Sequence, residues 1–101
     1  MTMKPTLDLL KKAIAACAEA HGAQFCDWSE EDRQIAVKSE SVPTVSDVRM
    51  ICTAFFGNSS MVEVGWGYTN VYCDEVEMLD AVDEQELRLA LPFGTDFLAG
   101  K

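Results

Sequence analysis

Apolar residues recur at helical spacing near the start of the chain. The recurrence predicts a helix over residues 7–21. Thr6 precedes the first apolar position and can cap this helix, and Gly22 can end it. The stripe that should face the protein interior consists of Leu7, Leu10, Ile14, Cys17 and His21.

A second helical pattern occupies the middle of the chain. Thr44, with an acidic residue three positions later at Asp47, predicts an N-cap, and Gly57 predicts the end of the helix. The stretch 48–56 is also rich in β-branched and aromatic residues, so a strand is the competing prediction. We prefer the helix because its start and stop signals agree with the periodicity. Its apolar positions are Val45, Val48, Ile51, Cys52, Phe55 and Phe56.

Alternating apolar and polar residues predict two β-hairpins. The first consists of strands over 24–28 and 33–40, joined by an acidic turn over 29–32. Ile35 and Val37 mark the buried face of its second strand.

The second predicted hairpin has strands over 62–68 and 71–78. In the second of these strands, alternation would place Glu75 and Glu77 on one face and Asp74 on the other. The first strand has an apolar face that consists of Val62, Val64, Trp66 and Tyr68.

A short helix is predicted near the end of the chain. Asp83 can serve as its N-cap with Glu86 at the third helical position. The helix should stop by Leu91, because Pro92 disfavours helical geometry in the residue before it.

The predicted elements follow the order α-β-β-α-β-β-α, which indicates an α+β fold. Two hairpins can join into one antiparallel four-stranded sheet with the helices packed on one face. The 101 residues suffice for a single α+β domain over 1–101, with a flexible leader over 1–5 and an apolar C-terminal tail over 92–101. No membrane-length apolar stretch and no secretory signal is visible, so we expect a cytoplasmic protein that does not bind membranes.

The four cysteines lack the spacing of a zinc knuckle or of a redox Cys-X-X-Cys pair. We therefore expect reduced thiols, mostly buried, with no metal site and no cofactor. The one histidine, His21, lies at the predicted end of a helix, where its protonated form suits the helix dipole. A cysteine nucleophile with His21 as its base would need an orienting partner and an oxyanion site. The sequence indicates neither, so an enzyme is not expected.

Charge is unevenly distributed along the chain. The net charge of −9 argues against direct binding to nucleic acid, and no Lys or Arg lies between Arg49 and Arg88. Carboxylates concentrated in this stretch would steer basic partners toward the protein. The alternative is a solvated acidic face without a partner. The candidate partner-binding residues are Glu63, Asp74, Glu75, Glu77, Asp80, Asp83, Glu84 and Glu86.

In size, acidity and compact α+β organisation, the chain resembles the small anti-CRISPR inhibitors encoded by phages and other mobile elements. Many of those proteins block the nucleic-acid path of an effector complex. The resemblance implies a non-enzymatic inhibitor that mimics nucleic acid. Its partner would be a basic protein surface, such as that of a nucleic-acid-binding effector.

The chain is also similar to type III secretion chaperones, which are acidic α+β dimers of about this length. This second resemblance implies a homodimer that holds a client protein through exposed apolar surface. The residues that would supply the client or dimer surface are Phe55, Phe56, Phe93, Phe97 and Leu98.

Overall fold

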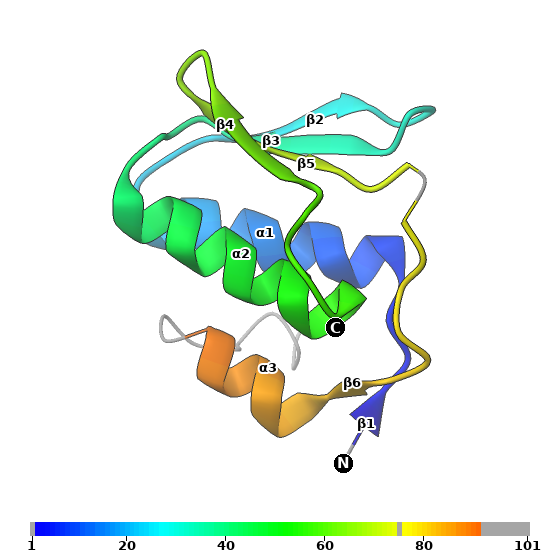
Figure 1. Cartoon of the computed structure of the whole chain (residues 1–101). Coiled ribbons are helices and arrows are strands. Elements are labelled where there is room, and N and C mark those ends of the chain that lie inside the picture. The colour runs from blue at the N-terminus through cyan, green and yellow to red at the C-terminus, as the bar shows by residue number, and fades with distance from the viewer. Residues whose placement is uncertain (1, 75, 92–101) are drawn as a thin grey trace.

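A four-stranded antiparallel sheet forms one layer of the protein (Figure 1). The computed structural model describes residues 2–74 and 76–91. Across the sheet, the strands are β2 (Phe25–Ser29), β3 (Gln34–Val37), β5 (Tyr68–Tyr72) and β4 (Val62–Gly65). The second strands of the two hairpins, β3 and β5, pair in the middle of the sheet. The sheet is therefore built from two hairpins, as predicted.

Two long helices cover one face of this sheet (Figure 1). They are α1 (Leu7–Ala20) and α2 (Val42–Phe56). A third helix, α3 (Glu84–Ala90), packs against α2 on the side away from the sheet. The α+β class and the order of helices and hairpins are confirmed. None of the described helices is long and apolar enough to cross a membrane.

The hydrophobic core fills the space between the sheet and the two long helices and continues to Leu87 of α3. On α2, the side chains of Ile51, Cys52 and Phe55 are fully buried, whereas Arg49 and Thr53 are exposed, as the helical periodicity predicts. Residues 48–56 are helical, so the competing strand is wrong. The core also contains Leu10 and Ile14 of α1, Ile35 and Val37 of β3, and Val71 of β5.

The cap predicted for α2 is wrong, because the helix begins three residues earlier. Its N-cap is Ser41, and Pro43 lies in the first turn, where a missing N–H costs no intrahelical hydrogen bond. Thr44 is instead a fully buried helical residue, with its Oγ1 2.7 Å from the hydroxyl oxygen of Ser41. Asp47 consequently lies in the second turn and takes no part in capping.

The second hairpin also differs from the prediction. It turns at Trp66 and Gly67, whose φ angles are 57° and 85°. Positive φ at both central residues is the signature of a type I′ turn, which matches the twist of the flanking strands. The hairpin's second strand therefore ends at Tyr72, and the described residues after it form no strand before β6 (Val82–Asp83).

Because β5 ends at Tyr72, the described acidic residues that follow it do not lie on the faces of a strand, contrary to the prediction from alternation. Asp74 and Glu77 lie in the segment between β5 and β6, where the alternation of a strand does not apply. Glu75 lies outside the described residues.

Residues near both ends of the described part of the chain form regular structure. The predicted leader contains a short strand, β1 (Thr2–Met3), which pairs antiparallel with β6. The pairing is non-local, so local sequence did not reveal it. Asp83 caps α3 as predicted, accepting a hydrogen bond from the Gln85 N–H at 2.9 Å, and α3 ends at Ala90 with Leu91 as its C-cap residue. The predicted apolar tail over 92–101 lies outside the described residues.

The buried Phe55 side chain provides a test of this core. Phe55→Ala should lower the free energy of unfolding by about 3 to 5 kcal/mol, because it removes apolar contacts and leaves a cavity beneath the sheet. Urea denaturation followed by circular dichroism measures the change. The control is Thr53→Ala on the exposed face of the same helix, for which we expect a change below about 0.5 kcal/mol. Equal effects of the two substitutions would contradict the orientation of α2.

Candidate functional site

An open apolar groove of about 770 Å³ is lined by residues of α2, β4 and α3. Its apolar lining includes Val42 and Met50 of α2, Val64 of β4 and Leu89 of α3, all of which are exposed. On α2, these positions lie opposite the buried face, since helical periodicity separates the two sets. Exposed apolar side chains gathered in a groove are typical of a binding surface.

The groove also has a charged lining. The side chains of Glu40 and Glu86 contribute two carboxylates, and Arg49 contributes one guanidinium group. The three formal charges leave the groove with an excess of negative charge. Its chemistry therefore suits a ligand that offers apolar groups together with at least one positive charge.

Trp66 is an exposed aromatic residue at the tip of the β4–β5 hairpin. Its side chain is 97% exposed, although its φ of 57° is unfavourable for a residue with a Cβ atom. Val64, two residues earlier on β4, lines the groove. Tryptophan is enriched among the residues that contribute most to protein–protein binding. The hairpin tip is therefore a candidate extension of the groove surface.

The structure does not gather the predicted acidic residues into one row. Glu63 is on β4 in the sheet, whereas β6 and α3, which carry Asp83, Glu84 and Glu86, lie beyond the α1–α2 layer (Figure 1). Glu84 is half-buried and pairs with Arg88 at 3.5 Å. The others that are described are exposed and form no ion pair with described residues: Glu63, Asp74, Glu77, Asp80, Asp83 and Glu86.

Only part of this acidic set borders a concave surface. Glu86 lines the apolar groove, and Glu77 and Asp80 share a polar hollow of about 550 Å³ with Arg33. Arg33 places a positive charge beside the two carboxylates of the hollow. Among the predicted acidic residues that the structure describes, Glu86 is the one that lines the apolar groove.

The four cysteines are free, and three of them are buried. Burial raises the pKa of the Cys17 and Cys52 thiols to about 12. Burial also raises the pKa of Cys73, whose thiol donates a hydrogen bond to the Arg33 carbonyl oxygen at 2.7 Å. These buried thiols are therefore protonated at neutral pH and are poor nucleophiles.

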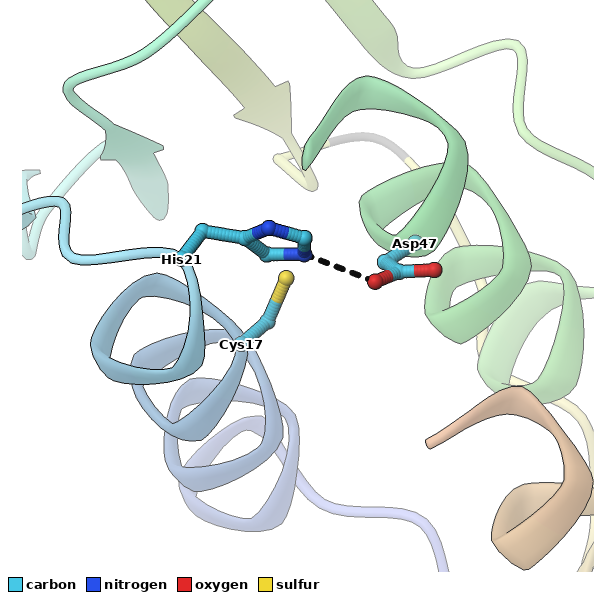
Figure 2. Close-up of side chains that lie close together, drawn as sticks. All are labelled: Cys17, His21 and Asp47. Carbon is cyan, nitrogen blue, oxygen red and sulfur yellow. Dashed lines mark hydrogen bonds and ion pairs between the residues drawn. The ribbon is translucent and has the colours of Figure 1, made fainter. Parts of the chain in front are cut away.

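Sequence reasoning missed a cluster formed by Cys17, His21 and Asp47 (Figure 2). His21 is the C-cap residue of α1, and its Nε2 lies 2.8 Å from the Asp47 Oδ2 in the second turn of α2. The hydrogen bond ties the end of α1 to the beginning of α2. The available signal was the four-residue spacing of Cys17 and His21, which places both on one helix face. Asp47 is distant in sequence and carried no comparable signal.

This cluster does not have the geometry of a nucleophilic triad. In such a triad, one imidazole nitrogen faces the nucleophile and the other faces the carboxylate. Here the Cys17 sulfur lies on the same side of the ring as Nε2, the nitrogen that Asp47 already engages (Figure 2). The raised pKa of the Cys17 thiol further disfavours nucleophilic attack.

No protein family, curated protein or solved structure matches the chain.

Thiol exposure predicts the order of chemical labelling. Under native conditions a thiol reagent such as Ellman's reagent should label Cys26 first, because this side chain is partly exposed and the other three are buried. All four thiols should react in denaturant. Absorbance of the released chromophore measures the number of reacted thiols. Cys26→Ser should abolish the first phase, and a fast phase that remains in this variant would contradict the described burial.

The backbone conformation of Trp66 predicts an effect on stability. Trp66→Asn should raise the free energy of unfolding by about 1 kcal/mol, because asparagine tolerates positive φ better in a type I′ turn. Chemical denaturation measures this change. In the same turn, Gly67→Ala should lower stability, since alanine is strained at a φ of 85°. A loss of stability in Trp66→Asn together with a gain in Gly67→Ala would rule out this turn geometry.

Proposed function

We propose that this protein is a non-enzymatic protein-binding module whose α2–β4–α3 groove binds a basic partner. The groove is the observation that carries the proposal, because it combines exposed apolar side chains with two carboxylates. A partner segment with one apolar and one basic face fits this chemistry. Trp66 would extend the contact at the edge of the groove.

Long-range electrostatics support a basic partner. The net charge of −9 attracts basic surfaces and repels nucleic acid and anionic membranes. The six exposed carboxylates among the predicted residues that form no ion pair with described residues contribute to this field without all touching the partner. They raise the association rate, while the groove supplies apolar contact that slows dissociation.

We further propose that the partner is a nucleic-acid-binding protein in the cytoplasm. Exposed carboxylates can occupy positions on a basic surface that phosphates would otherwise occupy. Binding there would inhibit the partner, as in the anti-CRISPR inhibitors that the chain resembles in size, charge and class. The acidity of the chain supports a partner of this class.

The groove favours a second candidate function, that of a dimeric chaperone-like protein that holds a client by apolar contact. Phe55 and Phe56, which were predicted to contribute to the client surface, are buried and cannot face a client. Phe93, Phe97 and Leu98 lie outside the described residues. The client surface would instead be the groove, with a second copy of the chain beside it.

Affinity capture at low and high salt, followed by mass spectrometry, tests whether the groove is the binding surface. We expect a partner captured by the wild type to be lost from Met50→Glu, with binding at least 10-fold weaker, about 1.4 kcal/mol. The matched control is Leu79→Glu, because Met50 and Leu79 are both 43% exposed and Leu79 is not among the groove residues. Equal binding by wild type and Met50→Glu would contradict the proposal.

Charge reversal tests the contribution of the acidic residue in the groove. Glu86→Lys should weaken capture and reduce its salt dependence more than Glu31→Lys in the β2–β3 turn, although both change the net charge equally. Binding kinetics over a salt series measure the difference. Identical effects of Glu86→Lys and Glu31→Lys would mean that Glu86 acts only through the long-range electrostatic field and does not contact the partner. Salt-independent binding linked to dimer formation would favour the chaperone-like function.

A further inference from the structure

Cys17, His21 and Asp47 bring three different metal-binding atoms together at the junction of α1 and α2. The sulfur, nitrogen and oxygen donors all lie within 4.8 Å of one another. Cys17 lies in the last turn of α1, His21 is the C-cap residue of that helix, and Asp47 comes from α2 (Figure 2). Two rigid elements therefore position the donors, and no loop has to fold around a ligand.

The separation of these atoms is close to that of a metal site. Tetrahedral Zn²⁺ with bonds of about 2.0 to 2.3 Å requires about 3.3 to 3.7 Å between neighbouring donors. The His21 Nε2 and Asp47 Oδ2 atoms are 2.8 Å apart and would need to separate by about 0.5 Å to admit the ion. Small side-chain rotations produce shifts of this size. The Cys17 sulfur is already on the side of the ring that carries Nε2 (Figure 2).

We propose that Cys17, His21 and Asp47 bind one Zn²⁺ ion. A mixed sulfur, nitrogen and oxygen donor set suits Zn²⁺, whereas Ca²⁺ and Mg²⁺ require oxygen ligands. Three protein ligands leave a fourth position for water. The His21 and Asp47 side chains are 23% and 16% exposed, so solvent can approach the cluster from their side. This site is separate from the groove and does not depend on the proposed function.

The binding reaction exchanges a proton for the metal ion. The Cys17 S–H bond breaks, the sulfur–zinc bond forms, and the proton leaves to solvent. Without metal, the Nε2–H of the His21 ring donates to the Asp47 carboxylate. On binding, this ring proton is exchanged through solvent to Nδ1, which frees Nε2 to bind zinc, and Asp47 replaces the hydrogen bond by a bond to zinc. No electron transfer is involved. The positive charge of Zn²⁺ stabilises the Cys17 thiolate, whose negative charge is otherwise unfavourable in a buried environment.

Direct titration tests this site in the full chain. Isothermal titration calorimetry with zinc chloride, in reducing buffer, should show one ion per chain, and zinc should raise the melting temperature. Titration with Co²⁺ should produce a thiolate-to-cobalt charge-transfer band, which reports a sulfur ligand whether or not stability changes. Absence of both zinc binding and the cobalt band up to millimolar metal would overturn the proposal.

Matched variants assign the ligands. Asp47→Asn and His21→Gln should bind zinc at least 10-fold more weakly, and Cys17→Ser should also lose the cobalt band. Cys26→Ser removes a thiol outside the cluster and should leave affinity within twofold of wild type. Circular dichroism without metal verifies that each variant folds. If Cys17→Ser does not fold, Asp47→Asn provides the test. Unchanged affinity in folded Asp47→Asn and His21→Gln would overturn the proposal, as would loss of binding in Cys26→Ser.

Discussion

The burial of one face of α2 is the constraint on which the rest of the structure depends. Val48, Ile51 and Phe55 are completely removed from solvent between the helix and its neighbours. A chain of 101 residues has room for one such core, so the sheet and α1 must both pack around this helix. The position of α2 then determines where α3 can pack and which α2 side chains remain exposed.

Both candidate sites follow from the placement of α2. Its face opposite the core carries Val42 and Met50, which remain exposed because α3 and β4 flank this face without closing it. Near its beginning, the helix carries Asp47 to the end of α1, where the carboxylate meets His21. The groove and the Cys17–His21–Asp47 cluster are thus two consequences of one helix packed in one orientation.

The acidity of the chain acts over a wider area than either site. Because the carboxylates lie on opposite sides of the helical layer, they form a general negative field and do not form a continuous binding row (Figure 1). Such a field influences the rate at which a basic partner arrives. Specific recognition requires local chemistry, and the groove with Glu40 and Glu86 supplies it.

The amino-acid sequence alone determined the elements whose signals are local. The periodicity of α1 and α2, the caps at Thr6 and Asp83, and the order of helices and hairpins were predictable, because each depends on residues a few positions apart. Its composition likewise determined the strong negative charge. The start of α2 was missed because Pro43 is compatible with a first helical turn as well as with a preceding loop.

Only the tertiary structure decided the features that depend on distant residues. The turn at Trp66 and Gly67 requires positive φ at a tryptophan, which local preference disfavours and the pairing of β4 with β5 accommodates. The pairing of β1 with β6, the contact between His21 and Asp47, and the groove all join segments far apart in the chain. Periodicity assigns a residue to a face of its own element. Which element covers that face is decided by the packing of the whole core.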